Sequence, residues 1–132
     1  GNNINARYKA AKAWSIWEAS TSKLIQNKKS LHHFENEDIA DIFARIECHF
    51  FINEGFFEYD GWLLDQIDII RHIPCVIVQG RYDVVCPMIT AWELHKKWPE
   101  ADFHIIQDSG HSMLEAGIRD KLIEYTNKYA NL

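Results

Sequence analysis

Two short apolar runs in the second half of the sequence, separated by a helical pattern, constrain the fold most. The first run, Cys75–Val78, is continuous and is followed by Gln79-Gly80, which is typical of a strand buried on both faces. A helix is predicted over residues 88–97, where Trp98-Pro99 ends it, and the second run, Phe103–Ile106, is predicted to be another strand. A strand, a helix and a strand in this order predict an α/β fold with two parallel strands.

The first half of the sequence is predicted to be helical. Apolar residues recur at three- and four-residue steps over residues 4–20, with Trp14 and Trp17 on the stripe. After a polar stretch without periodicity, a second helix is predicted from the N-cap Asn36 to about residue 51. The apolar side chains predicted on its buried face are Ile39, Ile42, Phe43, Ile46 and Phe50. Glu47 falls one step beside this face.

Two more helices are predicted around the two strands. One covers residues 61–71, with Asp60 as its N-cap, and the other covers residues 113–129. The side chains of the first that are predicted to point inward are Leu63, Leu64, Ile67 and Ile70. The change from helical to α/β patterning places a boundary between residues 55 and 72.

Composition restricts the partners and the compartment. The 132 residues include 14 Lys+Arg and 19 Asp+Glu, a formal net charge of −5, which argues against nucleic acid as the main partner. The cysteines Cys48, Cys75 and Cys86 form no Cys-x-x-Cys pair, so a reducing compartment and hence a cytoplasmic location are predicted. An apolar run of about 18 residues is absent, and neither a membrane span nor a signal peptide is predicted.

An acidic residue and a histidine follow the two predicted strands. Asp83 comes after the first strand in Gly80-Arg81-Tyr82-Asp83, and His111 comes after the second strand. Because the carboxyl ends of parallel strands meet at one edge of a sheet, the two side chains are expected to lie close together. A carboxylate that orients an imidazole is two-thirds of a hydrolytic triad, and acid before histidine is the chain order of α/β-hydrolases.

Several longer motifs resemble one family. The runs AAKAWSIWE, ARIECHFFINEGFF, IRHIPCVIVQGRYDVVCP, AWELHKKWPEADFHII and SGHSMLE are similar to the C-terminal half of proline iminopeptidases, which are serine peptidases with the α/β-hydrolase fold. The resemblance implies the last two parallel strands of that fold with flanking helices, preceded by a helical cap segment. It assigns residues 1–58 to the cap and residues 59–132 to the catalytic domain.

The resemblance also implies an activity and a set of site residues. The family removes N-terminal proline from peptides without a cofactor, through a Ser-Asp-His triad. Asp83 would be the triad acid and His111 the triad base, while Glu18 and Glu47 would bind the N-terminal ammonium of the substrate. Cys86 would lie near the pocket.

The two glutamates suit this substrate on chemical grounds. A prolyl N-terminus is a secondary ammonium with two N–H donors, which two carboxylates from different helices can accept. The aromatic side chains near these glutamates that could form apolar walls for the proline ring are Trp14, Trp17, Phe50 and Phe51.

The nucleophile of the triad is missing from this sequence. None of its serines lies in a Gly-x-Ser-x-Gly turn, and no glycine-rich oxyanion loop is present. A complete hydrolase of this kind has roughly 250–300 residues, so the sequence is interpreted as a fragment. On its own this fragment is predicted to be inactive.

The sequence leaves two alternatives open. The acid and base positions are common to α/β-hydrolases, so the substrate could instead be an ester, an epoxide or a haloalkane. The chain could also be a non-catalytic module that forms homo-oligomers through the exposed edge of a short sheet. The remaining histidines show no metal-binding spacing, so no metal is predicted.

Overall fold

The computed structural model describes residues 3–26 and 36–130. The chain divides into two compact units, and the second begins at Tyr59 apart from a short segment, residues 22–24, that also packs with it. Of the described residues, the first unit contains 3–21, 25–26 and 36–58. The loop that the sequence predicts before Asn36 falls mostly on residues 27–35, which are outside the described ranges.

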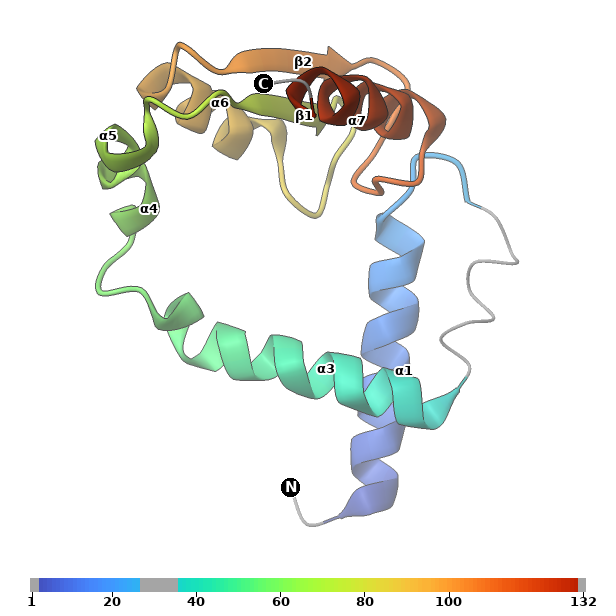
Figure 1. Cartoon of the computed structure of the whole chain (residues 1–132). Coiled ribbons are helices and arrows are strands. Elements are labelled where there is room, and N and C mark those ends of the chain that lie inside the picture. Colours follow the sequence, from blue (N-terminus) through green and yellow to red (C-terminus); the bar gives the residue numbers. More distant parts are fainter. Residues whose placement is uncertain (1–2, 27–35, 131–132) are drawn as a thin grey trace. The chain divides into compact units, whose positions relative to one another are not determined.

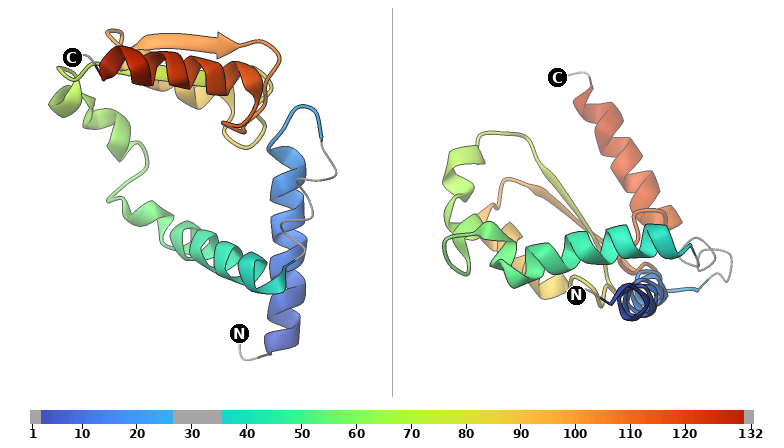
Figure 2. Two further views of the ribbon diagram at one scale, coloured as in Figure 1. Left: turned by 45° about the vertical axis from the view of Figure 1, so that its right-hand side comes forward. Right: turned by 90° about the horizontal axis from the view of Figure 1, so that it is seen from below.

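The first unit is a pair of helices followed by a single helical turn. Helix α1 covers Ile4–Thr21, α3 covers Glu37–Ile52 and the 3-10 turn η2 covers Glu54–Phe56. As predicted, Asn36 caps α3, because its side chain accepts hydrogen bonds from the backbone N–H groups of Asp38 (3.0 Å) and Ile39 (3.2 Å). Figures 1 and 2 show α1 and α3 crossing each other.

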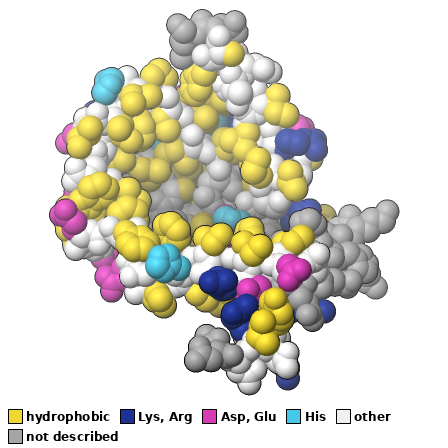
Figure 3. Space-filling view, turned by 60° about the horizontal axis from the view of Figure 1, so that its bottom comes forward, with side chains coloured by type: hydrophobic (Ala, Val, Ile, Leu, Met, Phe, Trp, Pro, Cys, Tyr) yellow, Lys and Arg dark blue, Asp and Glu magenta, His cyan; other side chains and the backbone are white. Residues whose placement is uncertain are grey.

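The contact between α1 and α3 corrects the predicted buried face of α3. The side chains that are buried are small or polar: Ala11 and Ser15 on α1, and Ala40, Asp41 and Ala44 on α3. The predicted apolar face instead stays exposed at Ile42, Phe43, Ile46 and Phe50. Figure 3 shows that hydrophobic side chains are visible at the surface. Small side chains let the two helices approach closely, so the helices meet through these residues and not through the bulky stripe.

A buried ion pair joins the two helices. The Asp41 side chain is only 7% exposed, and its Oδ1 accepts a hydrogen bond from Arg7 Nε at 2.8 Å. Arg45 lies one helical turn away, with its guanidinium 3.8 Å from the other carboxylate oxygen. Because a buried charge that loses its partner is costly, this pair fixes how α1 lies on α3.

The second unit contains the predicted pair of parallel strands. Strands β1 (Val76–Gly80) and β2 (Asp102–Ile106) pair in register from Val76 opposite Asp102 to Gly80 opposite Ile106, and α6 (Met88–Lys97) connects them. Helix α7 (Ala116–Tyr129) packs against β1 (Figure 1). The core that supports the sheet is formed by Ile67, Trp98 and Ala101, with Cys75, Ile77 and Leu94 packed against it.

The helix predicted over residues 61–71 is wrong in detail. Two short helices, α4 (Trp62–Asp65) and α5 (Ile67–Ile70), are separated at Gln66. Asp60 is not the N-cap: Gly61 occupies that position, with a left-handed φ of 86°, and no side chain caps the helix. Of the apolar side chains predicted to point inward, only Ile67 is fully buried, and Leu63 is 55% exposed. Because α4 and α5 are only four residues long each, they do not form the continuous buried stripe that a single longer helix would form.

The last helix also begins later than predicted, at Ala116 and not at Met113. The Glu115 carboxylate accepts hydrogen bonds from the backbone N–H groups of Gly110 (2.8 Å) and Leu24 (3.0 Å). These bonds hold Glu115 in an extended conformation, so the helix starts after it. Strand β1 departs from its prediction too: Gln79 and Gly80 are buried, but Val76, Ile77 and Val78 are only half-buried.

Gly80 permits the close approach of the chain after β2. A Cβ atom at this position would lie 1.8 Å from the Gly110 carbonyl oxygen, so backbone would have to move to admit it. Gly80→Ala is therefore expected to lower the free energy of unfolding by about 3 kcal/mol. Gly61→Ala is the matched control, because an added Cβ atom at this position meets no neighbouring atom. The substitution adds only the strain of a left-handed backbone conformation, about 1 kcal/mol. Urea unfolding of both variants measures these changes, and an equal loss of unfolding free energy in the two variants would contradict the role of Gly80.

No helix in the described part of the chain is long and apolar enough to cross a membrane. In the same residues the sheet has two strands, so each strand has one edge that pairs with no other strand. Self-association through such an edge stays a prediction.

Candidate active site

The loops after β1 and β2 are joined by backbone hydrogen bonds. The N–H of Arg81 donates to the Ile106 carbonyl (2.9 Å), and the N–H of Tyr82 donates to the Ser109 carbonyl (3.0 Å). Ser109, whose carbonyl accepts the second of these bonds, is buried. These bonds bring the loop that carries Asp83 and the loop that carries His111 to the same edge of the sheet.

Asp83 is held in place by groups of its own loop. Its Oδ1 accepts hydrogen bonds from the backbone N–H groups of Val85 (3.0 Å) and Cys86 (2.8 Å). Gln79 donates to its Oδ2 at 3.3 Å, and the Asp83 side chain is only 6% exposed. A carboxylate that accepts two backbone N–H bonds through one oxygen is fixed in orientation, so its other oxygen points in a defined direction.

That second oxygen faces His111. The distance from Asp83 Oδ2 to His111 Nδ1 is 3.0 Å, and the histidine side chain is 38% exposed. An ionised carboxylate can only accept, so we assign the proton to Nδ1, which leaves the Nε2 lone pair to take a proton. The His111 backbone is fixed in turn, because its N–H donates to the Ser22 carbonyl at 3.0 Å. The geometry is that of an oriented general base.

Gln79 was not predicted to belong to this arrangement. Its side chain is buried at the end of β1, and its Nε2 also lies within hydrogen-bond distance of the carbonyls of Gly80 (3.2 Å) and Cys86 (3.1 Å). It therefore ties the strand end to the turn that carries Asp83. A polar residue directly after a continuous apolar run was the available signal.

Cys86 is exposed, and its backbone contacts the acid and Gln79. Its N–H donates to Asp83 and its carbonyl accepts from Gln79. The predicted role of Cys86 in a substrate pocket stays a prediction.

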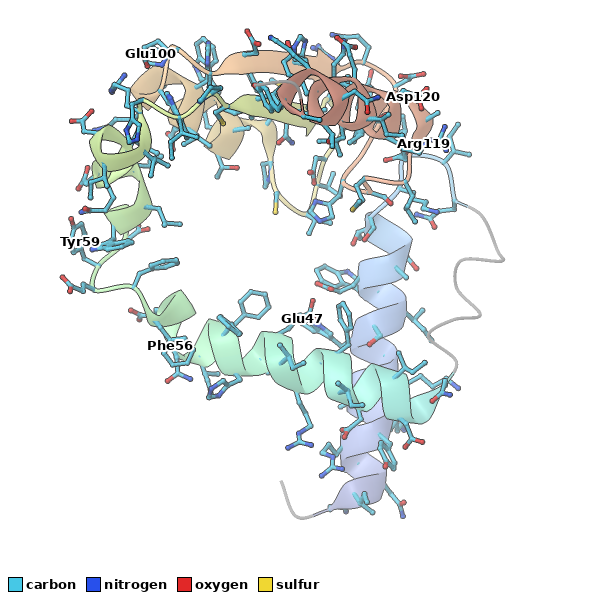
Figure 4. All side chains as sticks on the ribbon, in the orientation of Figure 1. Glu47, Phe56, Tyr59, Glu100, Arg119 and Asp120 are labelled. Atoms are coloured by element: carbon cyan, nitrogen blue, oxygen red, sulfur yellow. The ribbon has the colours of Figure 1, made fainter. Side chains whose placement is uncertain are left out.

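Glu18 and Glu47 belong to the two helices of the first unit. Glu47 projects from α3 (Figure 4), and its Oε2 accepts a hydrogen bond from the indole N–H of Trp14 at 2.7 Å. Glu18 comes four residues after Trp14 on α1, so both lie on the same face of that helix. The structure thus joins Glu47 to the α1 face that carries Glu18.

Aromatic rings surround Trp14. Its ring centroid lies 5.4 Å from that of Trp17 and 6.2 Å from that of Phe51, the second in an edge-on arrangement. Phe50, the fourth predicted wall residue, instead packs edge-on against Phe56, with 5.5 Å between ring centroids. Three of the four predicted aromatic residues therefore form one cluster beside Glu47.

A cavity of about 510 Å³ opens along the same pair of helices. Its charged lining residues are Arg7, Asp41 and Arg45. Neither Glu18 nor Glu47 lines it, although Trp14, which donates to Glu47, is one of its lining residues.

The clearest pKa shifts occur at the opposite end of the sheet from Asp83 and His111. Burial raises the pKa of the Cys75 thiol, directly before β1. The hydrogen bond from Tyr125, followed by that from Lys128, lowers the pKa of Asp102 at the start of β2.

In the described ranges, no three His, Cys, Asp or Glu side chains are grouped so that they could hold a metal ion.

Comparison with known proteins shows what this chain is related to. No model of a known protein family matches it. It is 57% identical over 123 residues to a "Probable proline iminopeptidase" of Leptolyngbya boryana and 48% identical over 127 residues to a "Proline iminopeptidase" of Arabidopsis thaliana. These matches cover 93% and 96% of this chain, whereas the chain spans only 38% and 33% of those relatives.

A solved structure supports the fold. An esterase from Exiguobacterium antarcticum matches with a TM-score of 0.57 at 17% identity, over 99% of this chain and 48% of that one. At this identity the match shows the fold alone, and it confirms the predicted class, part of an α/β-hydrolase with two parallel strands and flanking helices. Over nearly all of its residues the chain is thus similar to part of proteins named proline iminopeptidase, as its motifs indicated.

Proposed function

We propose that this chain supplies the acid, the base and the ammonium-binding carboxylates of a proline iminopeptidase, which releases N-terminal proline from peptides. The observation that carries the proposal is the 3.0 Å contact between Asp83 Oδ2 and His111 Nδ1. Relatedness to proline iminopeptidases favours this substrate over others that the same fold hydrolyses.

In the proposed reaction His111 acts twice. Its Nε2 takes the proton of a serine hydroxyl as that oxygen attacks the prolyl carbonyl, and then gives the proton to the departing amine. Water, deprotonated by the same nitrogen, hydrolyses the prolyl-serine ester and releases proline. Asp83 keeps Nδ1 protonated and stabilises the imidazolium in both steps. The serine lies outside this sequence, so the chain alone is proposed to be inactive.

The proposed role of Glu18 and Glu47 is to bind the N-terminal ammonium of the same substrate. Each carboxylate accepts one N–H of the prolyl nitrogen, so a peptide with a blocked N-terminus loses both bonds. The aromatic residues beside Glu47 offer apolar surface to the proline ring.

A chimera tests this function. In it, this chain replaces the matching 123 residues of the Leptolyngbya boryana relative, to which it is 57% identical. The chimera is expected to hydrolyse L-prolyl p-nitroanilide, and the isolated chain is expected not to. A chimera that folds, reacts with a serine-directed fluorophosphonate and hydrolyses p-nitrophenyl esters but not the prolyl anilide would instead favour an esterase.

A further inference from the structure

The Trp14–Glu47 contact is a short hydrogen bond between residues far apart in sequence. The indole Nε1–H of Trp14 on α1 donates to Oε2 of Glu47 on α3 over 2.7 Å. Bonds from a neutral donor to an ionised acceptor are shorter and stronger than bonds between neutral groups. A carboxylate can accept about four hydrogen bonds, so this one leaves Glu47 able to accept from a ligand.

The donor is itself held in place. Trp14 is half-buried, and its ring packs against Trp17 of its own helix and Phe51 of α3. An indole with two aromatic neighbours has little freedom to rotate, so its N–H points in one direction. A glutamate side chain has several rotatable bonds and loses this freedom only when such a fixed partner holds it.

We propose that Trp14 is the positioning residue that holds Glu47 toward the substrate ammonium. This inference rests on the proposed function, because it needs Glu47 to bind the N-terminus of the substrate. Trp14 and Glu18 share one face of α1, so the bond also ties Glu47 to the helix face that carries the second carboxylate. Two carboxylates can accept the two N–H donors of a secondary ammonium, so Trp14 contributes to binding of the substrate N-terminus.

Trp14→Phe in the chimera removes the N–H and keeps an aromatic ring. For L-prolyl p-nitroanilide we expect KM to rise and kcat/KM to fall about tenfold, with kcat changed less than twofold. The rate of inactivation by a fluorophosphonate, which needs the triad but no ammonium, is expected to stay within twofold of the parent. A purely structural role would lower both rates together.

A double-mutant cycle tests whether Trp14 acts through Glu47. Once Glu47→Gln has removed the carboxylate, adding Trp14→Phe is expected to cause less than a threefold further loss, because no charge remains for Trp14 to position. Tyr8→Phe is the matched control, since it removes another bond between α1 and α3, from Tyr8 Oη to Asp38 Oδ1 at 3.4 Å. Its kcat/KM is expected to stay within twofold of the parent.

The outcomes separate this inference from the proposed function. If Glu47→Gln lowers kcat/KM but Trp14→Phe does not, or if the two losses multiply, the positioning role of Trp14 is wrong and the proposed function stands. If Glu47→Gln itself has no effect, the ammonium-binding role of Glu47 fails, and the role of Trp14 fails with it.

Discussion

Replacing His111 with alanine in the chimera is expected to lower kcat for L-prolyl p-nitroanilide by about 10,000-fold. The proposed mechanism requires Nε2 to move a proton in each step, and no other group in the described loops replaces it. Asp83→Asn is expected to have a loss of similar size, because an amide in place of Oδ2 can donate to Nδ1 and so favours the wrong tautomer. A loss of this size equals about 5.5 kcal/mol of transition-state stabilisation.

Matched controls for these variants come from the same unit. His72→Ala removes an exposed imidazole, and Asp108→Asn neutralises an exposed carboxylate on the loop after β2. Both are expected to keep kcat within twofold of the parent. Steady-state kinetics measure kcat for each variant, and circular dichroism checks that each variant is folded. A His111→Ala enzyme with at least a tenth of the parental kcat would refute the role of His111.

The second large effect is expected from neutralising both glutamates. Each charge-assisted hydrogen bond to the substrate ammonium contributes about 2 kcal/mol, so Glu18→Gln combined with Glu47→Gln should lower kcat/KM about 1,000-fold. Glutamine keeps the size of the side chain and removes its charge, so packing between α1 and α3 changes little. The measurement is kcat/KM for L-prolyl p-nitroanilide.

The control for this pair is Glu58→Gln, which neutralises an exposed carboxylate of the same unit and is expected to have no effect. Fluorophosphonate inactivation of the double variant should proceed at the parental rate, since that reaction involves no ammonium. Parental kcat/KM in the double variant would show that the two glutamates do not bind the substrate.

The sequence predicts the parallel strands and the cap of α3 because local signals determine both. Continuous apolar runs bounded by Gly80 and by Pro99 identify the strands, and Asn36 satisfies the N–H groups two and three residues later. The packing face of α3 was not predictable in this way. An apolar stripe shows where burial would be favourable, whereas the contact with α1 is set by small residues and by the Arg7–Asp41 pair.

The same distinction between predictable and unpredictable features applies to the candidate site. Asp83 and His111 could be found because topology places the ends of parallel strands at one edge. Trp14 as a donor to Glu47 could not be found, because the two are 33 residues apart and their contact depends on how two helices cross. The break at Gln66 carries no glycine or proline signal either.

The most direct test of the central claim compares two substrates of the chimera, L-prolyl p-nitroanilide and its N-acetyl derivative. They share the scissile bond and the proline ring, and they differ in the ammonium that Glu18 and Glu47 are proposed to bind. The kcat/KM is expected to be at least about 1,000-fold higher for the free prolyl substrate. Equal values for the two substrates would contradict it.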